Sequence, residues 1–542
     1  MKENGTPLRL RAILMPLLLG IAVAAGFYMG ARLGGNRGLS GAFIELRRNT
    51  PGAKLQQVLD LIDRQYVDTV QSGKLVDEVL QQLLQDLDPH SYYISAADLR
   101  AAEEPLEGSF TGIGVEFSIQ HDTIVVMATI EGGPSEQMGI RAGDRLVRAD
   151  SVVLTGSDLN NDLVMRTLRG PTGTKVTVGV VRGNEKPFDV TLTRGPIPIN
   201  SVAVALLDHD GTGYIRLNRF ARTTGEEFLK AAATLNEQGM KRLVLDLRGN
   251  GGGYLNAAID ICEELLPKGS EIVYTQGRSS PRQDYLADGG GRLTTTPLAI
   301  LIDEGSASAS EIVAGAVQDN DRGLIVGRRS FGKGLVQEQI NLRDNSAIRL
   351  TTARYYTPSG RSIQRPYGKG IAYNDDLEQR FAHGELLSLD SIHLDSSAVY
   401  HTRQGRTVYG GGGIMPDLFV PADTADHSSY LTGLLFSGAP NNYAFDVADR
   451  NRARLARYGG PERFNAEYQI GQAQLQELAS QASRSGLKEN PAELERSAPV
   501  IILRLKSLIA RNIWGETGYY RVLLEKDRIY QQARQALQQQ VL

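Results

Sequence analysis

The stretch RLVLDLRGNGGGYLNAAIDICEELL spans residues 242–266 and joins a strand-like run to a helix-like run through a glycine-rich turn. Its first part, 242–247, predicts a strand, and 254–266 predicts a helix. Glycine-rich turns at this place expose backbone N–H groups that can hold an anion or an oxyanion. The turn lacks the lysine of a P-loop and the full GxGxxG spacing, which disfavours nucleotide binding. A tight turn without any chemistry explains this stretch equally well when it is taken alone.

The same strand-then-helix order repeats on both sides of this stretch. Strand-like runs at 214–217 and 298–302 precede helix-like runs at 225–237 and 309–317, and further strands are expected at 324–326 and 348–355. Such alternation predicts an α/β core. Three regions with other sequence patterns flank this core. Apolar residues recur at helical spacing over 54–88 and again after Pro440, and short strand-like runs separated by Gly, Pro and Asp extend from about 106 to 195.

Two more loops carry residues capable of chemistry. The loop GSASASE (305–311) leads into a predicted helix, so it places serine hydroxyls beside free N–H groups and the positive end of the helix dipole. Helix capping by Ser306 or Ser308, with Glu311 completing a capping box, is the commoner explanation of such a string. The loop SFGKGLVQ (330–337) places Lys333 and Gln337 four residues apart, on one face. A lysine buried beside a serine can lose its proton and act as a general base.

Several motifs in order resemble one family. They are LDPHSYYIS (87–95), GSFTGIGVEF (108–117), GGPSEQMGIRAGDRLVRAD (132–150), LRGPTGTKVTV (168–178), DLRGNGGGYL (246–255), SASASEI (306–312), GKGLVQ (332–337), RYYTPSGRSIQ (354–364) and GGGGIMPD (410–417). This chain resembles the C-terminal processing (tail-specific) peptidases, which are Ser/Lys proteases with a PDZ domain. The resemblance implies a multidomain α/β protein with a crotonase/ClpP-like protease core and an inserted PDZ domain. The residues themselves add helical regions at both ends and an N-terminal transmembrane anchor to this expected fold.

The resemblance also implies roles for single residues. Ser308 corresponds to the nucleophile, Lys333 to the general base and Gln337 to the group that orients this base. The N–H groups of Gly252 and Ala309 correspond to the oxyanion hole. The chain departs from the frequent family pattern at Gly251, where proline often stands, and at Asp303, where asparagine is common.

The stretch Gly112-Ile113-Gly114-Val115 resembles the loop of PDZ domains that grips a free C-terminal carboxylate. A bound peptide then adds as a strand to the sheet edge. A structural turn between two strands is the alternative for this stretch. The resemblance implies a serine endopeptidase that binds the C-terminal tail of its substrate and cleaves near it through an acyl-enzyme.

The N-terminus predicts the compartment. Residues 12–31 form an uncharged segment of bilayer length, preceded by Lys2, Arg9 and Arg11. We expect an uncleaved anchor in a bacterial inner membrane with the catalytic part in the periplasm, and a cleaved signal peptide is the alternative. The expected division is a cytoplasmic tail (1–11), the anchor (12–31), an N-terminal helical region (51–105), a PDZ domain (106–195), the protease core (196–422) and a C-terminal helical extension (423–542).

Composition limits partners and cofactors. The chain has 542 residues, and 59 Lys and Arg balance 62 Asp and Glu, which disfavours nucleic acid as a partner. The single cysteine and the spacing of the seven histidines predict no metal site, and no cofactor is expected. Substrates with apolar free C-termini and the membrane are the expected partners, while an activating adaptor protein and a homo-oligomer stay open. A catalytically silent PDZ scaffold and a Ser-His-Asp hydrolase are the rival functions; the chain has no G-x-S-x-G motif.

Overall fold

The computed structural model describes residues 20, 22–26, 51–183, 185–368, 370–393 and 397–539. Contacts divide the chain into two compact units, residues 1–83 and 84–542. The predicted anchor at 12–31 falls largely outside the described residues. Among the residues that are described, no helix has the length and apolar character needed to cross a membrane. The anchor therefore stays a prediction.

Two helices begin the described stretch that starts at residue 51. They are α3 (Pro51–Gln65) and α4 (Ser72–Gln85), where helical spacing of apolar residues predicted them. Helix α3 buries none of its side chains and α4 buries only Leu84. Of the apolar residues that gave the sequence its periodicity, Leu55, Val58 and Leu83 are exposed, and most of the others are only partly buried.

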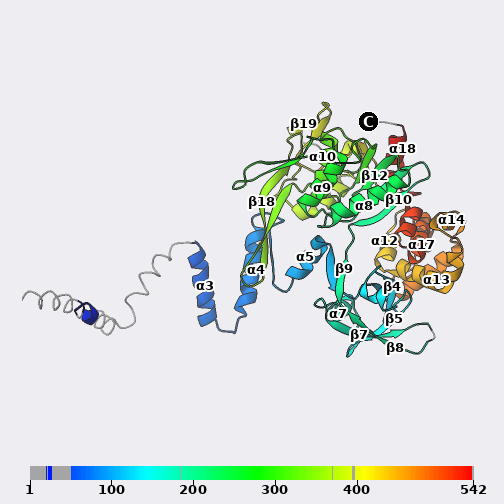
Figure 1. Ribbon diagram of the computed structural model, residues 1–542, viewed down its shortest axis with the longest axis horizontal. Coiled ribbons are helices and arrows are strands. Elements are labelled where there is room, and N and C mark those ends of the chain that lie inside the picture. Colours follow the sequence, from blue (N-terminus) through cyan, green and yellow to red (C-terminus); the bar gives the residue numbers. More distant parts are fainter. Residues whose placement is uncertain are drawn as a thin grey trace, which may run out of the picture. The chain divides into compact units, whose positions relative to one another are not determined.

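The core of the larger unit is a six-stranded sheet (Figure 1). Its strands, in spatial order, are β10 (Val202–Leu207), β11 (Thr212–Leu217), β12 (Arg242–Asp246), β15 (Leu298–Ile302), β16 (Leu324–Gly327) and β21 (Leu418–Phe419). Only β10 pairs in the antiparallel sense. Helices α8 (Thr224–Glu237), α9 (Leu255–Leu265) and α10 (Ala309–Asp319) follow β11, β12 and β15 along the chain, so the predicted α/β alternation is confirmed.

Both faces of this sheet are covered. Leu243, Leu245 and Ile300 belong to the cluster that contains α8, α9 and α10. The alternate residues, Val244 and Leu301 among them, belong to a second cluster with the last helix, α18 (Arg528–Gln538). Successive side chains of a strand point to opposite faces, so each strand contributes to both clusters. Helix α18 is thereby part of the core of the larger unit.

A second sheet lies in the same unit and carries the lysine loop. It contains β1 (Tyr92–Ile94), β13 (Glu271–Gln276), β14 (Gln283–Leu286), β17 (Leu335–Asn341) and β18 (Ala347–Tyr356). Strand β18 pairs with β1, β13 and β17. Since β1 follows the LDPHS motif directly, this pairing brings that motif to the lysine loop.

A separate sheet forms the PDZ-like region. Its strands are β3 (Val115–Gln120), β4 (Thr123–Thr129), β5 (Arg145–Ala149), β6 (Val152–Val153), β7 (Lys175–Val181) and β8 (Phe188–Thr193), accompanied by α6 (Pro134–Gln137) and α7 (Asn161–Leu168). Helix α5 (Leu99–Glu107) precedes this region, and β2 (Ser109–Gly112) pairs with β9 (Gly195–Pro198). The entering and leaving segments therefore run side by side, as an inserted domain requires. Among the described strands, β3 pairs only with β4, which leaves its other edge open.

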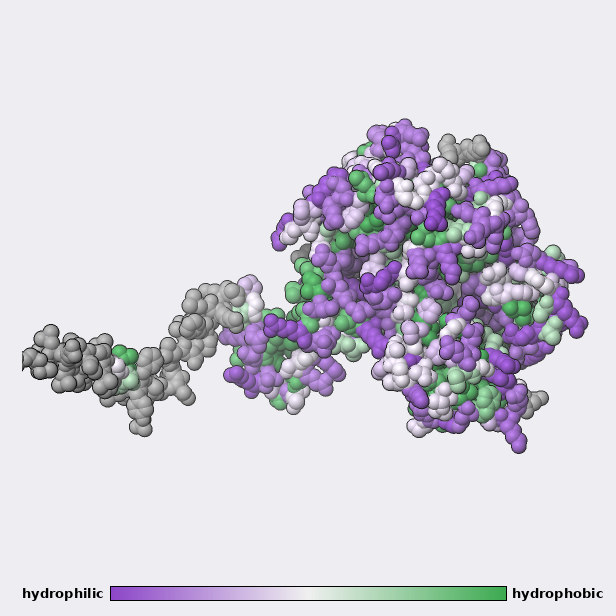
Figure 2. Space-filling view, viewed as in Figure 1, coloured by the Kyte–Doolittle hydropathy of each residue, from purple (hydrophilic) through white to green (hydrophobic). Residues whose placement is uncertain are grey.

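The rest of the chain is mostly helical. Between β18 and β21 lie α11 (Asp376–Ala382), β19 (Val399–His401), β20 (Thr407–Tyr409) and two short 3-10 turns, Tyr373–Asp375 and Leu389–Ser391. After β21 come α12 (Ser429–Phe436), α13 (Ala439–Ala456), α14 (Pro461–Glu467), α15 (Gln472–Arg484), α16 (Pro491–Arg496) and α17 (Ala498–Leu523). These six helices share a core of their own. The surface is mainly hydrophilic with scattered apolar patches (Figure 2).

Candidate active site

Ser308 occupies the sharp turn between β15 and α10. Its backbone has φ 57° and ψ −113°, a conformation that strains any residue other than glycine by roughly 1–3 kcal/mol. Ser306 and Ser310 are fully buried, and their hydroxyls donate to the carbonyl oxygens of Leu247 and Asn250 over 2.8 Å each. Ser308 alone of the three lines a cleft. The structure thus separates one accessible serine from two structural ones.

The glycine-rich turn after β12 lies directly against the serine loop. The Asp303 carboxylate accepts hydrogen bonds from the N–H of Gly249 at 2.8 Å and of Gly305 at 3.0 Å. A Cβ at Gly305 would come within 2.9 Å of the Gly249 Cα, so this contact needs glycine. Asp303, the departure noted in the sequence, is therefore one of the links between the two loops.

Gly252 adjoins Ser308 and Ala309 as an oxyanion donor must. A Cβ on Gly252 would lie 2.7 Å from the Ser308 Cβ and 2.9 Å from the Ala309 nitrogen. In this structure, however, the Gly252 N–H donates to the side-chain oxygen of Asn250 over 2.9 Å. The two predicted oxyanion residues are together, but one of their N–H groups is already engaged. Asn250 had no signal in the sequence.

Lys333 lies just before β17 and is half-buried. Its Nζ donates to Oε1 of Gln337 over 3.0 Å, across a β-bulge between Val336 and Gln337. Burial, followed by the positive charge of Arg349, lowers the pKa of Lys333. The predicted burial and the predicted Gln337 partner are both present. Among the described residues no hydrogen bond joins Lys333 Nζ to Ser308.

Glu311 holds the serine and lysine loops together from inside the protein. Its fully buried carboxylate accepts hydrogen bonds from the N–H of Ser308 at 2.8 Å, of Lys333 at 2.9 Å and of Gly332 at 2.7 Å, and from the Ser330 hydroxyl at 2.5 Å. Burial raises the pKa of Glu311 to about 7, against the opposing effect of these four donors. The sequence indicated only the capping contact.

Tyr355 makes the complementary contact to the same two residues. The buried Tyr355 hydroxyl lies 2.6 Å from the Lys333 carbonyl oxygen and 3.1 Å from the Ser308 carbonyl oxygen. Glu311 thus engages the N–H groups of Ser308 and Lys333 while Tyr355 engages their carbonyls. Two side chains fix the spacing between the candidate nucleophile and the candidate base.

His90 lies beside the site and contacts Gln337 through its backbone. Its carbonyl oxygen accepts a hydrogen bond from Nε2 of Gln337, and its ring Nε2 lies 2.8 Å from the Tyr373 hydroxyl. Burial, with the charge of Lys333 as the second cause, lowers the pKa of His90 to about 4. The ring is therefore neutral at physiological pH. The backbone contact to Gln337 gives His90 a structural role beside the site.

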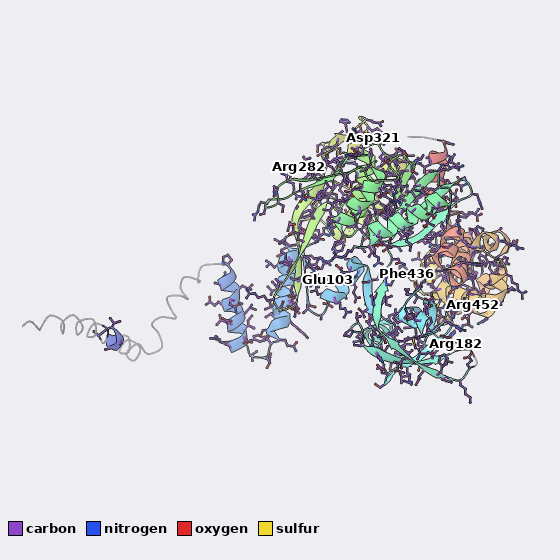
Figure 3. All side chains as sticks on the ribbon, viewed as in Figure 1. Glu103, Arg182, Arg282, Asp321, Phe436 and Arg452 are labelled. Carbon is purple, nitrogen blue, oxygen red and sulfur yellow. The ribbon has the colours of Figure 1, made fainter. Side chains whose placement is uncertain are left out.

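Ser308 and Lys333 line one cleft of about 870 Å³. The cleft is lined by residues of the glycine-rich turn, the start of α9, strand β17 and Glu103 of α5. Figure 3 labels Glu103 beside α5. Glu103 accepts a hydrogen bond from Gln339 of β17 over 2.6 Å. A cleft of this size accommodates several residues of an extended peptide.

The candidate carboxylate-binding loop has the geometry of a turn with free donors. Gly114 has φ +75°, and no hydrogen bond in the described part of the chain uses the N–H of Ile113 or Gly114. The loop leads into the open edge of β3, whose Val115, Phe117 and Ile119 are only partly buried. This edge can accept an additional strand with apolar side chains.

Known proteins match the same regions. Residues 211–375 match peptidase family S41, residues 111–192 match the PDZ domain, and residues 430–515 match a family of unknown function. The chain is 38% identical over 333 residues to the carboxy-terminal-processing protease of Bartonella bacilliformis, which covers 60% of this chain and 75% of that protein. It is 31% identical over 351 residues to the carboxy-terminal processing protease CtpB of Bacillus subtilis, covering 63% of this chain and 71% of that protein.

A solved structure is similar as well. The photosystem II D1 C-terminal processing protease aligns over 70% of this chain and 89% of its own, with 28% identity and a TM-score of 0.37.

The matches give the class that the fold and the cleft had indicated, a serine peptidase with a PDZ domain. The chain belongs to the carboxy-terminal processing proteases of peptidase family S41. The family resemblance drawn from the sequence motifs is confirmed, and the protease is favoured over a silent scaffold. Among the described residues no group of His, Cys, Asp and Glu is arranged to hold a metal ion.

Proposed function

We propose that this protease uses Ser308 as its nucleophile, Lys333 as its general base and Gln337 to orient that base. The observation that carries this assignment is the hydrogen bond from Lys333 Nζ to Gln337 Oε1 inside the cleft that Ser308 lines. A half-buried lysine with a lowered pKa has a larger neutral fraction near pH 7 than an exposed one. Its lone pair is then available for the serine proton.

The reaction follows from these roles. Neutral Lys333 takes the hydroxyl proton of Ser308 while the Oγ of Ser308 attacks the scissile carbonyl carbon. The tetrahedral intermediate collapses, Lys333 returns the proton to the leaving amine, and an ester to Ser308 remains. Lys333 next deprotonates a water molecule that hydrolyses this ester, which releases the new carboxylate and restores the hydroxyl.

The developing oxyanion needs two donors. We assign them to the N–H of Ala309, for which no acceptor is present among the described residues, and to the N–H of Gly252. The Gly252 N–H becomes available when the substrate oxygen replaces Asn250 Oδ1 as its acceptor. This exchange preserves the number of hydrogen bonds and orders the donor for the transition state.

Substrate selection is assigned to the PDZ domain. A free C-terminal carboxylate would bind the N–H groups of the loop Gly112-Ile113-Gly114-Val115, and the tail would pair with β3. The apolar side chains along β3 support a preference for apolar tails. Converting the terminal carboxylate of such a tail to an amide should weaken binding because the charged acceptor is lost.

The test uses an unstructured reporter with an apolar C-terminus. Wild type, Ser308→Ala and Lys333→Ala are compared for cleavage, and Lys230→Ala, at an exposed lysine of α8, is the control. Both site variants should lose about a thousandfold or more in kcat/KM while the control keeps wild-type activity. Full activity in either site variant contradicts the assignment. A wild-type protein that binds the tail but does not cleave the reporter would support the catalytically silent PDZ scaffold instead.

We also propose the membrane location that the sequence predicts. The apolar segment 12–31 and the preceding basic residues support a single anchor with the catalytic part in the periplasm. Fractionation and protease accessibility in intact cells test it. Recovery of the full-length chain in the soluble cytoplasmic fraction would count against it. Association with an adaptor or with further copies is tested by purification under the same conditions.

A further inference from the structure

A residue near the end of the chain contacts the base of the glycine-rich turn. Asp527 caps α18, accepting the N–H of Tyr530 at 3.1 Å through Oδ1. The same carboxylate binds the guanidinium of Arg248, with Nη1 3.1 Å from Oδ1 and Nη2 2.8 Å from Oδ2. Asp527 lies beyond the residues that match the family of unknown function.

Arg248 belongs to a compact cluster of four charges. Its side chain also binds the fully buried Asp246 through two bonds of 2.9 and 2.6 Å, and Arg216 binds Asp246 at 2.9 Å. The cluster contains two guanidinium groups and two carboxylates, so it is neutral only with Asp527 present. Removing one partner of a buried ionic network leaves an uncompensated charge, which is strongly unfavourable.

Arg248 immediately precedes the loop that faces the serine. Its N–H donates to Asp246 at 3.0 Å and its carbonyl oxygen accepts from Arg216 at 3.0 Å. Two residues later, the Asn250 carbonyl oxygen accepts from Ala307 N–H and from the Ser310 hydroxyl. A shift of Arg248 therefore moves the segment that orders Gly252 and the serine loop.

We propose that Asp527 is a positioning residue for the catalytic centre, acting through Arg248 on the glycine-rich turn at residues 249–253. The inference rests on the proposed function, since it takes this turn to be the oxyanion loop. The C-terminal helix thus contributes to catalysis as well as to the core. Substrate binding in the PDZ domain does not depend on this contact.

The variant Asp527→Asn isolates the ionic contact. Asparagine caps helices as well as aspartate does, so α18 keeps its cap. Its amide oxygen replaces Oδ1, but its NH₂ group faces the Arg248 Nη2 that Oδ2 had accepted. The matched control is Asp210→Asn, which removes a carboxylate bound to Arg534 of the same helix at 3.0 Å without touching Arg248. Asp527→Glu tests rescue by charge.

Two readouts separate positioning from helix docking. The first is kcat and KM on the reporter, and the second is hydrogen–deuterium exchange over residues 248–253 and 528–538 of the full chain. We expect Asp527→Asn to lower kcat about 10- to 100-fold with KM little changed, because small misplacements of a reacting site have effects of this size. Exchange should rise in 248–253 and stay unchanged in 528–538, Asp527→Glu should recover part of kcat, and Asp210→Asn should leave kcat unchanged.

Other outcomes overturn the proposal. Unchanged kcat together with unchanged loop exchange in Asp527→Asn excludes positioning, and faster exchange throughout 528–538 indicates loss of helix docking instead. If wild type does not cleave at all, the proposed function fails. The loop exchange of the variant still decides whether Asp527 orders residues 249–253.

Discussion

Lys333 donates a hydrogen bond from Nζ to Oε1 of Gln337 over 3.0 Å. The amide of Gln337 is oriented in turn, because its Nε2 donates to the carbonyl oxygen of His90. A neutral amine that gives one N–H to Gln337 keeps its lone pair for another proton. The contact is therefore compatible with the base form of lysine, and the population of that form determines how activity responds to pH.

The first prediction concerns that pH dependence. Burial lowers the pKa of Lys333, and only the neutral amine accepts the serine proton, so kcat/KM should rise with pH through this lowered pKa and fall on the acid side. Gln337→Glu places a negative charge at the amine, which favours the ammonium form. The acid limb should then move to higher pH. The measurement is kcat/KM on the reporter from about pH 5 to 9.

The control for this shift is Asn341→Asp, which adds the same charge at the exposed end of β17. Its acid limb should coincide with that of wild type. An unchanged limb in Gln337→Glu, or an equal shift in both variants, contradicts Lys333 as the base whose protonation is observed.

The second prediction concerns Glu311. Glu311→Ala leaves two buried and two partly buried donors without their acceptor. Each buried donor that loses its partner costs about 1–3 kcal/mol, so the free energy of unfolding should fall by at least about 3 kcal/mol. Urea denaturation measures it. Glu338→Ala, at an exposed neighbour on β17, is the control and should change stability by less than about 0.5 kcal/mol. Near-wild-type stability in Glu311→Ala would contradict the bridging role of this carboxylate.

Glu311 also predicts a direction of stability with pH. Its folded-state pKa of about 7 exceeds the usual value of 4.5 for glutamate. The protonated carboxyl therefore favours the folded state, and this contribution is complete below about pH 4.5 and lost as pH rises through about 7. Between these limits the free energy of unfolding of wild type should decrease with pH relative to that of Glu311→Gln, which has no proton to lose at this position.

Periodicity predicted the α/β core because it depends on local sequence, and the family resemblance implied that three loops converge. Glu311 shows where local reasoning stops. Its spacing from Ser308 predicts a capping box, which is correct, but its contacts with Gly332 and Lys333 depend on a loop that the fold brings in from about twenty residues away. Nothing local distinguishes a buried acceptor of four hydrogen bonds from an ordinary cap.

Long-range contacts explain the remaining differences. His90 meets Gln337 because β1 pairs with β18, and Asp527 meets Arg248 because α18 covers the second face of the core sheet. An amphipathic helix pattern states that one face will be buried but does not identify the surface that buries it. The hydrogen bond from the Gly252 N–H to the Asn250 side chain is a local contact, because both residues belong to one loop. The sequence of the loop does not determine whether this bond forms.

The third prediction separates the lysine mechanism from a histidine mechanism. His90→Gln removes the ring but keeps the carbonyl that holds Gln337, so kcat should stay within about tenfold of wild type, far above Lys333→Ala. The ring is neutral because burial lowers its pKa to about 4. The unfolded chain binds this proton more tightly, so between about pH 4 and 6.5 the stability of wild type should increase with pH relative to that of His90→Gln, which lacks the imidazole. A thousandfold loss of kcat in His90→Gln supports the histidine mechanism instead.

The fourth prediction uses two neighbouring glycines that differ in their surroundings. Gly252 has φ +94°, and a Cβ there would lie 2.7 Å from both the Ala307 carbonyl oxygen and the Ser308 Cβ. A Cβ at Gly251 would meet no heavy atom of the described chain within 4 Å, and its φ is not positive. Gly252→Ala should therefore displace the serine turn and lower kcat/KM at least about a hundredfold, since misplacing a reacting group by about 1 Å has this effect. Gly251→Ala should keep activity within about threefold, as expected for an open surface position.

Reporter cleavage measures the activity of both variants. Binding of an apolar-tailed peptide, which depends on the PDZ domain, should be equal in the two variants. If both substitutions reduce cleavage alike, the loop as a whole is sensitive and the close approach of Gly252 to Ser308 has no special role.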